Sequence, residues 1–132
     1  MPVVFEALTL ATEQDRQDLH KIYLDAPDGL LADQGDASTL IANALASGQL
    51  VAGRFNGRLL GAARLDRQAG TWQLSHLCVR KLTRRRGVAE RLLSEAHRLA
   101  SQAGAELRLL ASAGHLEARA LAAKLDLPLD HD

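Results

Sequence analysis

The amino-acid sequence predicts one domain, residues 1–132, of mixed α/β (α+β) class, with helices on both faces of a mostly antiparallel sheet. Asn56 and Gly57 join two apolar runs. This dipeptide favours a β-hairpin because a type I′ turn needs positive φ at both central residues. Strand and helix patterns then alternate, and an arginine-rich turn connects one strand to a long amphipathic helix. With 47% hydrophobic residues, the chain has enough apolar side chains for a core.

The first part of the chain predicts one strand and two helices. A short apolar strand is expected over residues 3–9. Thr12 is expected to cap a helix, because Asp15 follows three residues later and completes a capping-box pattern. A second helix is expected over residues 38–47, and Gly48 stands where a left-handed residue would end it.

The rest of the chain predicts three antiparallel strands in series, then a helix, a strand and a last helix. The expected strands cover residues 50–55, 58–65, 71–80 and 106–111, and the expected helices cover residues 84–103 and 115–126. The chain is expected to end after the last helix without a further element.

The turn before the long helix, RRRGVA at residues 84–89, predicts a site for a phosphate or pyrophosphate group. A turn that opens a helix leaves several N–H groups without intrahelical partners, and the helix dipole places its positive end there. Gly87 lets the backbone approach an anion, and Ala89 is small where the ligand must pass. The three arginines before Gly87 add permanent positive charge.

The composition argues against some classes of function. Lysine plus arginine equals aspartate plus glutamate at 16 each, so no net charge favours nucleic acid or a membrane surface. A nucleic-acid-binding module is the weakest alternative, because one Trp, one Tyr and two Phe offer few stacking platforms. No apolar run is long enough to span a bilayer, and the single Cys78, inside an apolar strand, suits a buried thiol in a reducing compartment. A cytoplasmic protein without a metal site is expected.

The turn and the order of elements resemble the GNAT acetyltransferase superfamily, whose hallmark is Arg/Gln-x-x-Gly-x-Gly/Ala after the fourth strand. The resemblance implies the GNAT fold with a truncated C-terminus and with splayed fourth and fifth strands, between which the pantetheine arm of acetyl-CoA or CoA lies. The residues implied to hold this cofactor are Leu77, Cys78, Val79, Thr83, Arg84, Arg85, Arg86, Gly87, Val88, Ala89 and Glu90.

Three stretches are similar to the PanM family, also called PanZ: residues 14–23 (QDRQDLHKIY), 54–60 (RFNGRLL) and 79–93 (VRKLTRRRGVAERLL). These small GNAT-like proteins bind acetyl-CoA, associate with the aspartate 1-decarboxylase proenzyme and promote its self-cleavage. The similarity implies the same partner for this chain. The partner contacts that it implies are Arg54, Phe55, Asn56 and Arg85, although Asn56 is also explained by the turn and Phe55 by the core.

Catalytic residues are sparse. A working GNAT enzyme usually has a carboxylate or water-relay base and a tyrosine near the start of the last helix, whereas the only tyrosine, Tyr23, lies in the first helix. His76, which could face an acyl group, and His115, placed for a general acid, are weak candidates; a capping or surface role also explains His115. A non-catalytic acetyl-CoA sensor of the PanM type is therefore the first interpretation. The alternative is an active N-acetyltransferase for a small amine or a protein N-terminus.

Overall fold

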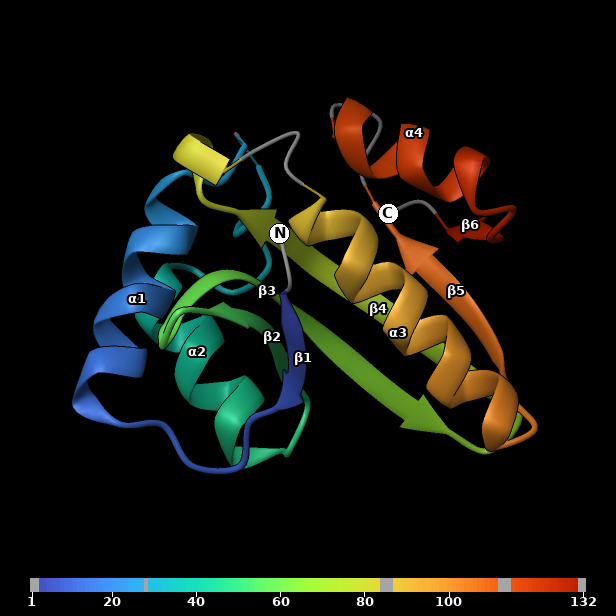
Figure 1. Ribbon diagram of the computed structural model, residues 1–132, viewed down its shortest axis with the longest axis horizontal. Helices are drawn as coiled ribbons and strands as arrows, with labels where there is room; N and C mark the ends of the chain where they lie inside the picture. Colours follow the sequence, from blue (N-terminus) through green and yellow to red (C-terminus); the bar gives the residue numbers. More distant parts are fainter. Residues whose placement is uncertain (1–2, 28, 84–86, 112–114, 131–132) are drawn as a thin grey trace.

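Within the described residues, six strands form one mixed sheet in the order β1-β2-β3-β4-β5-β6 (Figure 1). The computed structural model describes residues 3–27, 29–83, 87–111 and 115–130. The strands are β1 (Val4–Ala7), β2 (Leu50–Phe55), β3 (Arg58–Gln68), β4 (Thr71–Val79), β5 (Glu106–Leu110) and β6 (Leu129–Asp130). The helices are α1 (Glu13–Leu24), α2 (Ala37–Ala46), α3 (Val88–Gln102) and α4 (Leu116–Lys124), with a 3₁₀ turn, η1 (Lys81–Thr83). Neighbours from β1 to β4 pair antiparallel, whereas β5 runs parallel to β4 and β6.

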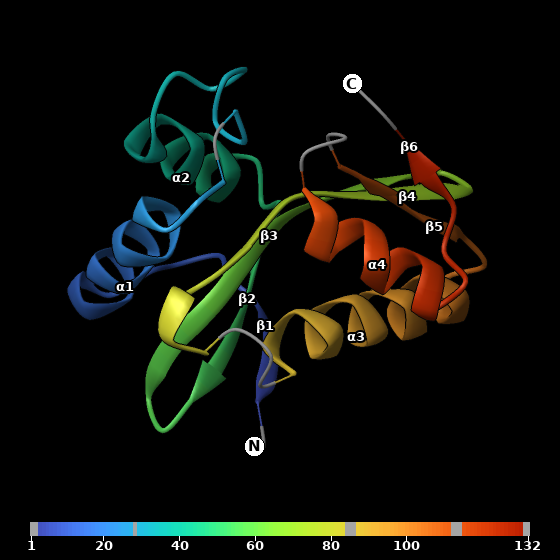
Figure 2. The same cartoon turned by 90° about the horizontal axis from the view of Figure 1, so that it is seen from above.

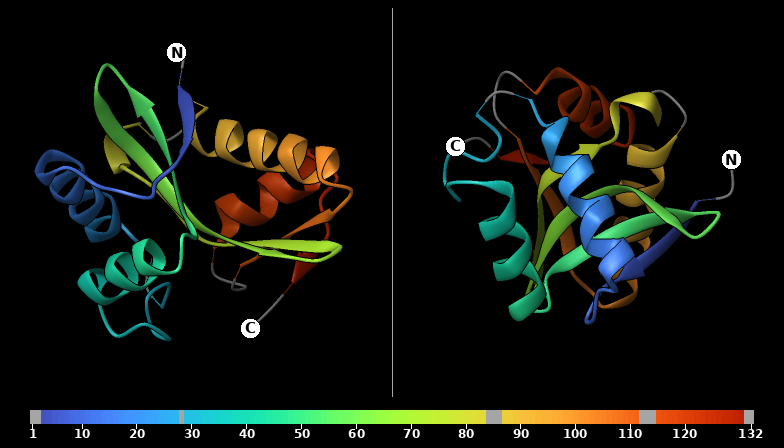
Figure 3. Two further views of the ribbon diagram at one scale, coloured as in Figure 1. Left: turned by 90° about the horizontal axis from the view of Figure 1, so that it is seen from below. Right: turned by 90° about the vertical axis from the view of Figure 1, so that its left-hand side faces the viewer.

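Helices cover both faces of the sheet, as the sequence predicts. Figure 2 shows α1 and α2 on one face and α3 and α4 on the other, and Figure 3 shows α1 and α2 side by side. Leu19, Ile22 and Leu40 are fully buried on the α1 face, and Leu92 and Leu93 on the α3 face. Each such side chain contributes about 1.5–3 kcal/mol on burial, so two cores hold the helices to the sheet. In the described part of the chain, no helix combines the length and the apolar character needed to cross a membrane.

The local predictions for turns and caps are confirmed. Asn56 and Gly57 both have positive φ, at 49° and 78°, in the β2–β3 turn. The Thr12 hydroxyl accepts the N–H of Asp15 at 3.0 Å, and the Asp15 carboxylate accepts the N–H of Thr12, which completes the capping box. Gly48 follows α2 with φ 70°.

A pair of glycines brings the start of α3 close to the sheet. Gly53 on β2 and Gly61 on β3 lie opposite each other. A Cβ added to Gly61 would lie 2.8 Å from a methyl group of Val88, and one added to Gly53 would lie 2.8 Å from a methyl group of Val3. Glycine therefore permits both valines to pack here. Because Gly61 pairs with Val79, the first turn of α3 lies beside the end of β4.

Strand β4 has a bulge near its middle, where it separates from β5. The register between β3 and β4 shifts after Ser75, and His76 adopts φ 54°, in the left-handed region. Pairing between β4 and β5 ends at Leu74 and Leu109, while β4 continues to Val79. Figure 1 shows the two strands moving apart toward their C-terminal ends. The predicted splay of the fourth and fifth strands is confirmed.

Two expectations about element boundaries are wrong. The long helix was expected from residue 84, but α3 begins at Val88, because Gly87 precedes it in the left-handed conformation that an α-helix cannot continue through. Residues 84–86 lie outside the described residues. The chain also does not end without a further strand, since β6 pairs with β5 between Leu129 and Leu109. A strand of two residues is too short to give a periodic sequence pattern.

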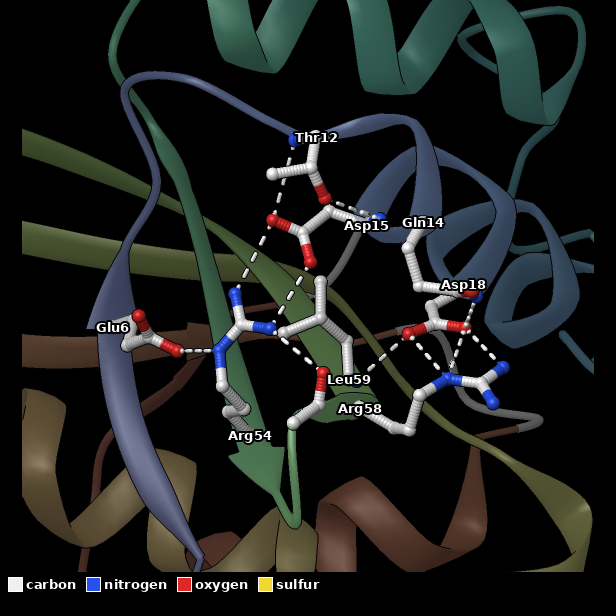
Figure 4. A network of polar contacts seen from close by, with 9 residues as sticks. Glu6, Thr12, Gln14, Asp15, Asp18, Arg54, Arg58 and Leu59 are labelled. Carbon is white, nitrogen blue, oxygen red and sulfur yellow. Dashed lines mark hydrogen bonds and ion pairs between the residues drawn. The ribbon is translucent and has the colours of Figure 1, made fainter.

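A network of carboxylate and guanidinium groups joins α1 to the β2–β3 hairpin (Figure 4). Asp15 accepts hydrogen bonds from Nη1 and Nη2 of Arg54 at 3.0 and 3.2 Å. Asp18, with 1% of its surface exposed, accepts a hydrogen bond from Nη2 of Arg58 at 2.6 Å and another from the N–H of Leu59 at 3.0 Å. The network fixes α1 against the hairpin that carries Asn56 at its tip, so Asp15 and Asp18 have structural roles.

These contacts lower the pKa of both carboxyl groups. The hydrogen bond from Arg54 is the largest cause for the pKa of Asp15. Burial acts to raise the pKa of Asp18, but hydrogen bonds from Arg58 and from the Leu59 N–H outweigh it. When the folded pKa is lowered, the stabilisation is fully present above the unfolded pKa of about 3.9 and is lost as the pH falls through the folded pKa. The attachment of α1 is therefore expected to weaken in acid.

Asp18→Ala is expected to lower the free energy of unfolding at pH 7 by roughly 2–3 kcal/mol, because the buried N–H of Leu59 and the Arg58 guanidinium lose their acceptor. Urea unfolding measures the loss, which should shrink as the pH falls below about 4. Glu13→Gln, on the exposed side of the same helix, is the control and should cost less than about 1 kcal/mol. An Asp18→Ala variant as stable as the parent protein would contradict the role of Asp18.

Candidate functional site

Among the described residues, no strand pairs with β4 beyond Leu74 on the side that faces β5. This open edge leads into two adjoining hollows, which we call together the β4 groove. One, of about 170 Å³, lies between β4 and the start of α4, and the other, of about 130 Å³, lies at the start of α3. Both are lined by Val79, Ala89 and Glu117. The described residues that were expected to hold acetyl-CoA all line one or both hollows: Leu77, Cys78, Val79, Thr83, Gly87, Val88, Ala89 and Glu90.

Other residues of the groove were missed by sequence reasoning. Pro27 reaches the first hollow from the segment after α1, and Leu116, Glu117 and Ala118 reach it from α4. Leu121, one helical turn further on, lines the second hollow. These positions are far from the arginine-rich turn in sequence, and no local pattern marks them, so only the fold identifies them.

The N-terminus of α3, at the second hollow, has no side-chain cap. The other described helices begin at Thr12, Asp36 and His115, whose side chains accept a backbone N–H of the first turn. Gly87 precedes α3 instead, and a Cβ added there would meet no described atom within 4 Å. Among the described residues, no side chain accepts the first N–H groups of this helix, and the helix dipole favours an anion at this end. The arginines expected to add charge, residues 84–86, lie outside the described residues.

Alternate residues of β4 turn their backbone groups toward the groove. The Arg80 N–H donates to a β3 carbonyl at 2.9 Å, whereas the Leu77 carbonyl accepts from His115 on the opposite side at 2.9 Å. Because backbone groups alternate between the two edges of a strand, Val79 faces the groove with Leu77, and Cys78 faces β3 with Arg80. Leu77 and Val79 are therefore placed to bond an extended ligand through the backbone, and Cys78 contributes only to the wall.

His115 joins the two sides of the first hollow. Its Nδ1 accepts the Ala118 N–H at 3.4 Å, and its Nε2 donates to the Leu77 carbonyl at 2.9 Å. Because Nδ1 is an acceptor, the neutral ring carries its proton on Nε2. The capping role considered for His115 is confirmed. To act as a general acid, His115 would first have to break its hydrogen bond to the Leu77 carbonyl.

His76, the other catalytic candidate, faces a different hollow. This hollow, of about 30 Å³, lies on the α1 face and is also lined by Asp33, Ser75 and Leu110. The His76 ring contacts Ser75 and Asp33 rather than any residue of the β4 groove. The two histidines therefore do not form one catalytic pair.

The hairpin tip expected to contact a partner is partly engaged inside the domain. Arg54 binds Glu6 as well as Asp15 (Figure 4), so its guanidinium is held within the network. Phe55 is half-buried and packs against the core on the α3 face. Asn56 is exposed. Of these three predicted contacts, Asn56 is the one placed to meet another molecule.

Splayed parallel strands beside an uncapped helix define a GNAT-type domain, and solved structures agree. The fold matches a protein from Pyrococcus horikoshii with a TM-score of 0.76 and 15% identity, over 94% of this chain and 87% of that one. It matches an N-acetyltransferase from Staphylococcus aureus with a TM-score of 0.70 and 18% identity, over 96% and 83% of the chains. It also matches a diaminobutyrate acetyltransferase from Paenibacillus lautus in complex with coenzyme A, with a TM-score of 0.65 and 14% identity, over 94% and 74%. At these identities the likeness shows the fold.

Sequence comparison identifies the family within this class. Residues 2–129 match the family described as "Acetyltransferase (GNAT) domain, PanZ", and the chain belongs to this family. A "PanD regulatory factor" from Escherichia coli is 38% identical over 85 residues. The match covers 64% of this chain and 58% of the length of that protein.

Cys78 is expected to react slowly with a disulfide reagent in the native protein. It is 3% exposed, and its Sγ donates to the Ile22 carbonyl at 3.2 Å, so the sulfur is shielded from the reagent. Labelling should be much slower in buffer than in guanidinium. A Ser47→Cys variant carries a second thiol at the exposed end of α2 and supplies the control for fast labelling. Equal native rates for the two thiols would contradict the burial of Cys78.

Proposed function

We propose that this domain binds acetyl-CoA in the β4 groove and, in that state, binds the aspartate 1-decarboxylase proenzyme and promotes its self-cleavage. The observation that carries the proposal is the unpaired edge of β4 leading into the uncapped N-terminus of α3. The likeness to a PanD regulatory factor supports the regulatory half. Acetyl-CoA would then act as the signal, and the decarboxylase as the target.

The groove residues suit the chemical groups along acetyl-CoA. The N–H groups that follow Gly87 are donors for a pyrophosphate, and each charge-assisted hydrogen bond contributes about 1.5–3 kcal/mol. The backbone groups of Leu77 and Val79 suit the amides of the pantetheine arm. The Glu90 carboxylate would repel the pyrophosphate. However, Nζ of Lys124 lies 3.0 Å from Oε1 of Glu90 and offsets the charge of that carboxylate.

A regulator is better supported than an amine acetyltransferase. Transfer to an amine needs an acid that protonates the leaving thiolate. The only tyrosine of the chain, Tyr23, is buried, donates to the His76 carbonyl at 2.9 Å and has a pKa well above its ordinary value because of that burial. His115 donates to the Leu77 carbonyl. Both residues that could supply the proton therefore hold backbone carbonyls.

Gly87→Glu is expected to abolish acetyl-CoA binding in isothermal titration calorimetry, because it places a side chain and a negative charge where the pyrophosphate would lie. Gly70→Glu is a matched control: Gly70 has φ 82°, close to the 83° of Gly87, and also faces open space, but it lies in the β3–β4 turn. The control variant should bind acetyl-CoA as the parent protein does. Unchanged affinity of the Gly87→Glu variant would refute the assignment of the groove.

Acetyl-CoA is expected to strengthen association with the decarboxylase proenzyme more than CoA does, because a ligand shifts an equilibrium only through different affinities for its states. Co-purification with tagged proenzyme and the time course of its cleavage measure this. Asn56→Ala and Arg85→Ala should weaken association, whereas Asn43→Ala, on the exposed side of α2, should not. Normal acetyl-CoA binding without association would end the regulatory half of the proposal and leave the groove assignment intact.

A further inference from the structure

Asp33, His76 and Ser75 form a chain of hydrogen bonds on the α1 face of the sheet. The Ser75 Oγ lies 2.9 Å from His76 Nδ1, and His76 Nε2 lies 3.0 Å from Asp33 Oδ1. An ionised Asp33 accepts the proton on Nε2, which leaves Nδ1 to accept the hydroxyl proton of Ser75. A hydroxyl beside a base, with the base oriented by a carboxylate, is the arrangement that activates a serine nucleophile.

The surroundings of this chain favour the reactive arrangement. Burial acts to raise the pKa of Asp33, but the hydrogen bonds from His76 and Gln34, with smaller electrostatic contributions, together outweigh it and keep the pKa below its ordinary value. The carboxyl group is therefore ionised at neutral pH. His76 has φ 54° in the middle of a strand, which is uncommon for a residue other than glycine. The buried Tyr23 hydroxyl donates to the His76 carbonyl at 2.9 Å, which restrains the backbone that carries the ring.

The chain lies where β4 and β5 part. Leu74 is the last β4 residue paired with β5, and Ser75 is the next. Ser75 and His76 line a hollow of about 30 Å³ opposite Leu110, which is enough for a water molecule. From Val79 to Ser75 the strand spans about 13 Å, at about 3.3 Å per residue. Ser75 and Val79 therefore lie at opposite ends of the stretch of β4 that does not pair with β5 among the described residues, and the hollow at Ser75 is distinct from the β4 groove.

A backbone donor is also near this point. The Leu77 carbonyl faces the gap between the strands, since it accepts from His115 there. The N–H of the same strand residue faces the same side. It is therefore placed to stabilise negative charge on a carbonyl oxygen bound in the gap, the role of an oxyanion donor.

We propose that Ser75 accepts small acyl groups from thioesters or activated esters, with His76 as its base and Asp33 as the residue that orients His76. The Ser75 Oγ forms a bond to the acyl carbon while its proton passes to His76 Nδ1. The bond from the acyl carbon to the leaving sulfur or oxygen breaks, and the proton passes from His76 to that atom. Water then attacks the serine ester by the same route, releases the carboxylic acid and restores the hydroxyl. For a coenzyme A thioester the inference rests on the proposed function, and for a free activated ester it does not.

The test is to treat the full chain separately with p-nitrophenyl acetate and with acetyl-CoA. Trypsin then releases the peptide of residues 68–80, in which fragmentation assigns the acetyl group to Ser75. Ser75→Ala should abolish this acetylation, and His76→Gln should slow it on the order of 10²-fold. Asp33→Asn should slow it by a smaller factor. Ser101→Ala removes an exposed serine at the end of α3 and should change nothing.

Each result decides between possibilities. Acetylation of Ser75 by both donors supports the inference and the thioester site together. Acetylation by p-nitrophenyl acetate alone supports the activated serine and overturns the transfer from a coenzyme A thioester, while the assignment of the β4 groove stands. No acetyl group on Ser75 with either donor, or acetylation confined to Cys78 or lysine, overturns the inference. A His76→Gln variant that matches the parent in circular dichroism and in acylation rate overturns it as well.

Discussion

On its β5 side, β4 pairs with no other strand from Ser75 to Val79 among the described residues. The rest of the candidate site depends on the gap that this leaves between β4 and β5. An unpaired strand edge presents N–H and C=O groups that are costly to bury and that can bind an extended ligand. The bulge at His76 bends β4 away from β5, and His115 occupies one carbonyl of the exposed edge. The groove exists because the two strands cannot close over this stretch.

The gap becomes a candidate ligand site because packing brings the N-terminus of α3 to it. The glycine pair Gly53 and Gly61 leaves room for Val88, and Gly61 pairs with Val79, so the first turn of α3 lies beside the open edge. A helix end that lacks a side-chain cap then faces the groove. On the opposite face, Asp18 holds α1 against the hairpin. The proposed ligand groove and the exposed hairpin tip therefore belong to the same sheet.

Features encoded within a few residues were predictable from sequence. Asn56 and Gly57 specify their turn through their tolerance of positive φ, and Thr12 and Asp15 specify a helix start through mutual hydrogen bonds. The sequence also named the described residues around Gly87 that line the second hollow, because a glycine between a strand and an amphipathic helix indicates a helix start open to a ligand. In each case the physical cause lies inside the segment that shows the pattern.

Features that depend on distant contacts were not predictable. His76 bonds Asp33, 43 residues away, and its carbonyl accepts from Tyr23, 53 residues away. A left-handed conformation at a histidine has no sequence signal comparable to that of glycine. Glu117 lines the groove because the start of α4 lies beside β4. The sequence around Tyr23 does not reveal that its hydroxyl donates to the His76 carbonyl. The roles of these residues could be identified only from the tertiary structure.

Amide hydrogen exchange, resolved by residue with and without acetyl-CoA, tests most directly whether the open edge of β4 and the start of α3 form one ligand site. We expect acetyl-CoA to slow exchange at Leu77, Val79 and the first turn of α3, because these N–H groups would gain acceptors. The N–H of Cys78 should change little, since it already faces β3. Protection that appears only away from β4 and α3, or no protection at saturating acetyl-CoA, would contradict a site built on the unpaired edge of β4.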